Sequence, residues 1–79
     1  MEPLEQIHEI VAELRDDSSI PKNVISKLEN MGSILEEGTN LHIQVDKAIQ
    51  LIDELLEDSN LQPFIRTRLW NISSLLESI

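Results

Sequence analysis

Four stretches of the chain carry apolar residues at helical spacing, and short polar segments separate them. The first stretch places its apolar residues at three- and four-residue steps: Leu4, Ile7, Val11 and Leu14. Such spacing puts all four on one face of a helix. Pro3 is tolerated in a first helical turn, and early glutamates suit the positive end of the helix dipole. A helix is therefore predicted from Pro3 to about Asp16.

The second predicted helix begins at Pro21, with Asp17, Ser18 and Ser19 as candidates to cap its free amides. Its expected inward-facing residues are Val24, Ile25, Leu28, Met31, Ile34 and Leu35. Gly38 permits the left-handed backbone conformation that ends many helices. We therefore expect the second helix to stop at this glycine.

The third predicted helix is capped by Thr39 or Asn40, and the fourth runs from Leu61 to the last residue. The third helix is expected to turn Leu41, Val45, Ala48, Ile49, Ile52, Leu55 and Leu56 inward. The fourth is expected to bury Leu61, Ile65, Leu69, Ile72, Leu76 and Ile79. The segment Asp58-Ser59-Asn60 separates the two helices.

The two halves of the chain align with each other without a gap when one is shifted by 41 positions. The matched residues include Glu13 with Glu54, Asp17 with Asp58, Leu28 with Leu69, and Asn30 with Asn71. This pattern predicts two similar hairpins, at about 3–38 and 41–79, although chance similarity between amphipathic helices is the alternative. Two hairpins that cover each other's apolar faces form one domain, 1–79. The predicted fold is all-α, an antiparallel up-down-up-down four-helix bundle.

Composition and charge narrow the class of protein. Hydrophobic residues make up 41% of the chain, which is typical of a folded domain, and cysteine is absent. The sequence shows no signal-peptide pattern and no apolar run near the ~20 residues of a membrane span. A net charge of −9 argues against nucleic acid and anionic membranes as partners. We therefore expect a cytoplasmic protein.

The basic residues are unevenly distributed along the chain. Lys22, Lys27, Arg66 and Arg68 lie on the second and fourth predicted helices, whereas the first and third are overwhelmingly acidic. This distribution favours ion pairs between neighbouring helices.

Candidate chemistry is sparse. Glu5 and His8 have the Glu-x-x-His spacing of ferritin-like metal sites, but the sequence contains no second pair. No serine is tied to a base by a known motif, and two glycines cannot form a phosphate-binding loop. The sequence thus predicts no enzyme, catalytic residues, cofactor, metal or small-molecule substrate. A metal-dependent or acid–base enzyme using Glu5 and His8 is the alternative.

Trp70 stands apart from this pattern because helical geometry places it almost opposite the apolar face of the fourth helix. Its match in the first half is Glu29. Exposed tryptophans are enriched at protein interfaces, and Arg66, one turn earlier, is placed to stack on the indole. The sequence therefore favours a protein-interaction module that binds another protein or a second copy of itself. The candidate binding residues are Arg66, Thr67, Trp70, Ser74 and Glu77.

Two other interpretations of the tryptophan remain. The indole folds over an edge of the bundle or closes a gap beside Phe64, the only other aromatic residue. Alternatively, the chain is a purely structural homo-oligomeric bundle.

Two segments also resemble a known family. They are the turn Asp17-Ser18-Ser19-Ile20-Pro21 and the segment Arg66-Thr67-Arg68-Leu69-Trp70-Asn71-Ile72. With these segments, and over nearly its whole length, the chain is similar to a small archaeal family known only as uncharacterised protein family 0147. The resemblance implies an archaeal source and a compact helical bundle. It implies no activity and no functional residues.

Overall fold

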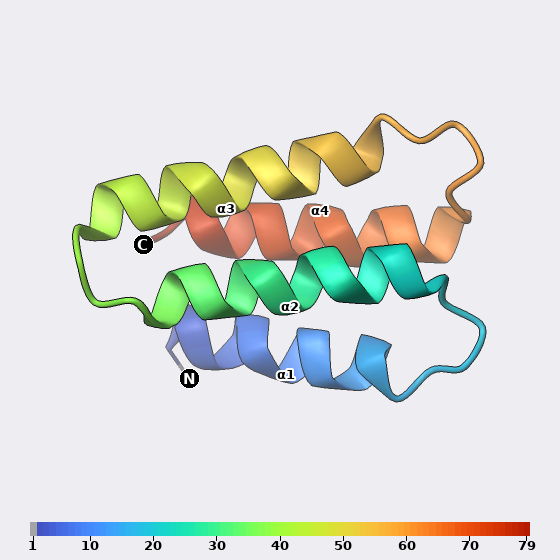
Figure 1. Cartoon of the computed structure of the whole chain (residues 1–79), viewed down its shortest axis with the longest axis horizontal. Coiled ribbons are helices and arrows are strands. Elements are labelled where there is room, and N and C mark those ends of the chain that lie inside the picture. The colour runs from blue at the N-terminus through green and yellow to red at the C-terminus, as the bar shows by residue number, and fades with distance from the viewer. Residues whose placement is uncertain (1) are drawn as a thin grey trace.

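The computed structural model describes residues 2–79 as four helices packed lengthwise (Figure 1). These helices are α1 (Pro3–Arg15), α2 (Lys22–Glu36), α3 (Leu41–Leu56) and α4 (Pro63–Glu77). Successive helices run in opposite directions. The α1–α2 and α3–α4 connections lie at one end of the bundle, and the α2–α3 connection lies at the other. The predicted all-α, up-down-up-down bundle of two hairpins is confirmed.

Each helix packs against two neighbours. α1 contacts α2 and α4, and α3 contacts the same two helices, so α1 and α3 lie diagonally across the bundle. This arrangement gives every helix one buried face and one outer face. The buried faces meet in a single aliphatic core that runs the length of a molecule measuring 33 × 23 × 19 Å.

Most of the predicted core residues are buried or half-buried, but two are exposed. Leu41 is 48% exposed and Ile79 is 38% exposed, although both continue the apolar spacing of their helices. Leu41 is the first residue of α3, and Ile79 follows the last turn of α4. Both therefore lie at helix ends, where fewer neighbouring residues are available to cover a side chain. The prediction that these two residues face inward is wrong.

The buried positions recur at the 41-residue spacing found in the sequence. Every buried aliphatic residue before Ala48 has a buried aliphatic counterpart 41 positions later. The pairs are Ile7 and Ala48, Val11 and Ile52, Leu14 and Leu55, Ile20 and Leu61, Val24 and Ile65, Leu28 and Leu69, Met31 and Ile72, and Leu35 and Leu76. Equivalent positions of the two hairpins therefore occupy equivalent environments in the core.

The connections within the two hairpins use the same local hydrogen bonds. Asp17 Oδ1 accepts from the Ser19 hydroxyl at 2.7 Å and from the Ser19 backbone N–H at 2.9 Å. Asp58 Oδ1 likewise accepts from the Asn60 backbone N–H at 2.9 Å. The two hydrogen bonds from Ser19, with that of its hydroxyl the stronger cause, lower the pKa of Asp17 from its usual value. These aspartates hold the turns that join the helices.

The helix ends differ in part from the predictions. Asp17, Ser18 and Ser19 do not cap α2, since its N-cap is Pro21 and receives no side-chain hydrogen bond. Ile20, between the Asp17 turn and the start of α2, is buried in the core. Asn40 caps α3 as expected, because its side-chain oxygen accepts from the Ile43 N–H at 3.2 Å. Gly38 has a φ of +69° and lies just beyond the end of α2.

Candidate functional site: the outer surface of the second hairpin

Trp70 lies on the outer side of α4 and is 54% exposed, as the sequence predicts. The α4 residues that face the core are Ile65, Leu69, Ile72 and Leu76. Thr67, Ser74 and Glu77 are also exposed, so four of the five candidate residues reach solvent. The Thr67 hydroxyl donates back to the Pro63 carbonyl at 3.2 Å, which occupies its hydrogen within the helix.

Arg66, the fifth candidate, is only partly exposed and directs its guanidinium toward α3. Its Nη1 donates to the Leu56 carbonyl at 3.0 Å, and its Nη2 donates to the Asp58 carbonyl at 2.7 Å. Carbonyl groups at a helix C-terminus lack intrahelical partners and carry partial negative charge. Arg66 therefore caps the end of α3, and stacking on the indole is not its role.

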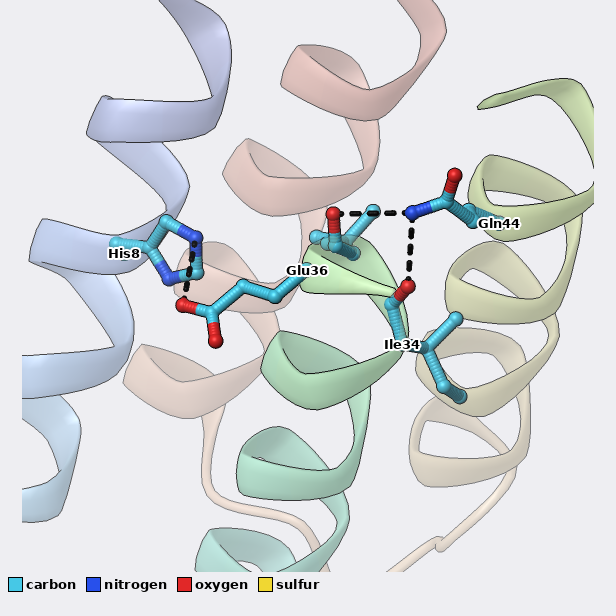
Figure 2. Close-up of polar contacts among 5 residues, drawn as sticks. His8, Ile34, Glu36 and Gln44 are labelled. Carbon is cyan, nitrogen blue, oxygen red and sulfur yellow. Dashed lines mark hydrogen bonds and ion pairs between the residues drawn. The ribbon is translucent and has the colours of Figure 1, made fainter. Parts of the chain in front are cut away.

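The same region of the first hairpin is a polar groove between α1 and α2, of about 430 Å³. Two ion pairs cross it. His8 Nε2 lies 3.8 Å from Glu36 Oε1, and Arg15 Nη1 lies 4.0 Å from Glu29 Oε2. Figure 2 shows the imidazole of His8, on α1, reaching toward the carboxylate of Glu36 at the end of α2. We call these four residues, together with Ala12, the polar groove.

The equivalent positions of the second hairpin are mostly apolar. The 41-residue spacing takes the polar groove to Ile49, Asp53, Leu56, Trp70 and Glu77, and we call these five residues the tryptophan face. Ile49 and Leu56 are half-buried on α3, whereas Asp53, Trp70 and Glu77 are exposed. Ile49 and Leu56 stand where the first hairpin has His8 and Arg15. These aliphatic side chains cannot form the ion pairs that cross the polar groove. The two hairpins thus share a fold but differ on their outer surfaces.

One signal for the tryptophan face lies in the comparison of the two halves of the chain and not in α4 alone. The 41-residue spacing pairs Glu29 with Trp70, Arg15 with Leu56, and His8 with Ile49. Two ion-pair partners and the histidine are thus replaced by apolar residues at equivalent positions. The apolar residues of α3 were predicted to face inward, but Ile49 and Leu56 are only partly covered.

Gln44, on α3, is a buried polar residue that the apolar pattern did not identify. Its side chain is only 3% exposed. The Nε2 atom donates to the Ile34 carbonyl at 2.9 Å and to the Leu35 carbonyl at 3.0 Å, as Figure 2 shows. These carbonyls lie in the last turn of α2, where main-chain acceptors have few helical partners, although the Ile34 carbonyl also accepts from the Glu37 N–H at 3.2 Å. Gln44 therefore joins the start of α3 to the end of α2.

The predicted ion pairs between neighbouring helices are confirmed for Lys27 and Arg68. Lys27 Nζ lies 3.4 Å from Glu54 Oε2 and joins α2 to α3. Arg68 pairs with Glu13 and joins α4 to α1. The two pairs correspond at the 41-residue spacing, since Lys27 matches Arg68 and Glu13 matches Glu54. In one pair the cation lies on the first hairpin, and in the other it lies on the second.

Glu5 and His8, the residues of the alternative enzyme hypothesis, are not brought together with further ligands. Glu5 is exposed, and His8 faces Glu36. Within residues 2–79, no group of three or more His, Cys, Asp or Glu side chains is arranged to hold a metal ion. No helix in this part of the chain combines the length and apolar character needed to cross a bilayer.

Comparison with known proteins identifies the family. The model of an uncharacterised protein family, UPF0147, matches residues 1–79. A UPF0147 protein of Methanosarcina mazei is 30% identical, and the match covers 99% of this chain and 85% of that protein. One from Methanothermobacter thermautotrophicus is 32% identical, with 99% and 78% covered. The crystal structure of the unknown-function protein MMP1188 superimposes with a TM-score of 0.87 at 32% identity, covering 98% of this chain and 89% of the other. The chain belongs to the uncharacterised protein family UPF0147.

Proposed function

We propose that this protein is a small interaction module that binds another protein through the outer surface of the second hairpin. The observation that carries the proposal is the exposure of Trp70, 54%, at a position where the first hairpin has the ion-paired Glu29. A tryptophan contributes a large rigid surface to an interface and loses little side-chain entropy there. Thr67, Ser74 and Glu77 surround it with polar groups, as at the rim of many interfaces.

Arg66 enters this proposal in a supporting role. Its hydrogen bonds to the carbonyls of Leu56 and Asp58 fix α4 against the end of α3. The outer surfaces of the two helices are thereby held in one relative position, which lowers the entropic cost of binding.

We further propose that the module acts in the cytoplasm, without catalytic activity, and binds neither nucleic acid nor membranes. The absence of cysteine is typical of chains that fold in a reducing compartment. The net charge of −9 repels the phosphate groups of nucleic acids and of anionic lipids. A chain that carries two hairpins in the 41-residue register also fits a duplicated ancestor in which only one copy acquired the tryptophan.

Site-specific photocrosslinking in the native cell tests the proposal. A photoreactive phenylalanine analogue replaces Trp70 in one variant and Glu29 in the other. Because these positions are equivalent in the two hairpins, the second variant is a matched control. A discrete adduct with another protein is expected from position 70 and not from position 29. Equal labelling at both positions, or none at position 70, would contradict the proposal.

Sedimentation equilibrium distinguishes self-association through the same surface from binding to another protein. We expect the purified chain to sediment as a monomer, because two copies that each carry a charge of −9 repel each other. A stable dimer that dissociates in the Trp70→Glu variant would instead support the homo-oligomeric bundle.

A further inference from the structure

The charges around Trp70 specify the chemistry of its partner. Asp53 on α3 and Glu77 on α4 are exposed members of the tryptophan face. In the polar groove, the equivalent of Asp53 is the uncharged Ala12, and the equivalent of Glu77 is Glu36, which has His8 as a partner. Each of the two surfaces therefore carries two carboxylates, but the tryptophan face has Ile49 and Leu56 where the polar groove has the ion-pairing His8 and Arg15.

The lysines and arginines of α3 and α4 are not placed to pair with these two carboxylates. Arg68 pairs with Glu13 on α1. Lys47 lies two turns before Glu54 on the same side of α3, the side that pairs with Lys27 on α2. Arg66 places its guanidinium on the main-chain carbonyls at the end of α3. The carboxylates of the tryptophan face consequently have no lysine or arginine of their own helices placed to neutralise them at the outer surface.

From these observations we propose that the partner presents a basic amphipathic helix to the tryptophan face. Its apolar residues cover Trp70, Ile49 and Leu56, and its lysines or arginines meet Asp53 and Glu77. This inference rests on the proposed function and adds the chemistry of the partner. A helix laid in the groove between two helices is a common way of recognising a peptide. Charge complementarity at the rim supplies orientation and speeds association.

A second copy of this chain fits the face less well. Its own tryptophan face would bring Asp53 and Glu77 against the same two carboxylates, and its net charge is also −9. Like charges placed together across an interface oppose binding. A basic helix relieves this repulsion.

Two designed peptides test the inference with the full-length chain. Both are 15-residue amphipathic helices with the same leucine positions and a fluorescent label. One carries lysine at every polar position, and the other carries glutamate. Fluorescence anisotropy measures binding, and the emission of Trp70 reports its burial. We expect the lysine peptide to bind at least ~10-fold tighter than the glutamate peptide and to shift the indole emission to the blue. Salt should weaken its binding.

Three variants distinguish the tryptophan face from general attraction to an acidic protein. Trp70→Glu should weaken binding at least ~10-fold although it makes the chain more acidic. The double variant Asp53→Asn, Glu77→Gln should weaken binding several-fold. The control Glu5→Gln, Glu9→Gln, which removes the same charge from exposed positions on α1, should leave binding unchanged. Circular dichroism verifies that every variant is folded.

The outcomes separate this inference from the proposed function. Equal loss in the two double variants, or unchanged binding by Trp70→Glu, would overturn the basic-helix partner. Failure of the lysine peptide to bind would also overturn it. If crosslinking from position 70 still captures a protein, the interaction module stands and only the chemistry of its partner is wrong. If position 70 captures none, the proposed function itself fails.

Discussion

At the scale of single residues, polar side chains fasten the helix ends. Gln44 and Arg66 each donate two hydrogen bonds to carbonyls where a helix finishes, α2 for Gln44 and α3 for Arg66. Carbonyls at a helix end have fewer main-chain donors than those within the helix, so these side-chain donors satisfy acceptors that would otherwise be short of hydrogen bonds. The amino-acid pattern did not reveal either role, because both depend on contacts between residues about ten positions apart.

Replacement of Gln44 by alanine should lower the free energy of unfolding by about 1–3 kcal/mol. The Leu35 carbonyl would lose its donor in a buried site, and the Ile34 carbonyl would keep only the Glu37 N–H. Leaving a buried acceptor unsatisfied carries a cost of that size. Urea denaturation followed by circular dichroism measures the change. Gln50→Ala, at an exposed position of the same helix, is the control and should change stability by less than ~0.5 kcal/mol. Equal effects of the two substitutions would contradict the role of Gln44.

At the scale of helices and their connections, the two glycines have opposite requirements. Gly38 has a φ of +69°, a conformation that strains a residue with a Cβ atom. Gly32 lies within α2, where a Cβ atom would meet the His8 Cε1 atom at 3.9 Å, an ordinary van der Waals distance. The sequence identified Gly38 as a helix terminator, but only the backbone geometry shows that Gly32 is replaceable.

Alanine at the two glycines should therefore change stability in opposite directions. Gly32→Ala should raise the free energy of unfolding by about 0.5–1 kcal/mol, since alanine favours the helix and restricts the unfolded chain. Gly38→Ala should lower it by about 1 kcal/mol or more. Thermal unfolding of the two variants beside the wild type measures both. A gain in stability at Gly38 would show that its left-handed conformation is not required.

At the scale of the whole molecule, the two hairpins contribute equivalent layers to one core. Leu28 and Leu69 are both completely buried, on α2 and α4, and correspond in the 41-residue spacing. The two ion pairs that join the hairpins, Lys27 with Glu54 and Arg68 with Glu13, follow the same correspondence. The core positions and these contacts thus recur at the 41-residue spacing, whereas the outer faces of the two hairpins differ.

Leu28→Ala and Leu69→Ala should each lower the free energy of unfolding by about 2–5 kcal/mol, and by similar amounts. Each leaves a cavity in the same kind of core layer. A chain of this size has little stability to lose. Chemical denaturation gives the two values. Asn30→Ala and Asn71→Ala, at two exposed positions that also correspond at the 41-residue spacing, are the controls. Each should change the free energy of unfolding by less than ~0.5 kcal/mol. A large difference between the two leucine variants would show that the cores of the hairpins are not equivalent.

The sequence by itself determined the four helices, most of the core and the position of Trp70 on the side of α4 opposite its apolar face. These features depend on the periodicity of apolar residues and on glycine, proline and asparagine at the helix ends, which are local properties of the chain. Helix boundaries were less accurate. The second helix was predicted to begin at Pro21, which is the N-cap of α2, and the fourth was predicted from Leu61 to the last residue, whereas α4 spans Pro63–Glu77.

Only the tertiary structure decided how the outer surfaces of the hairpins differ. The interhelical pairs of His8 and Arg15, and the absence of such cations at Ile49 and Leu56, matter because helix packing sets those residues beside α2 and α4. The same packing directs Arg66 to α3 and leaves Trp70 uncovered. Periodicity specifies the face of a helix on which a residue lies. The side chains it meets across the groove depend on the arrangement of helices distant in sequence.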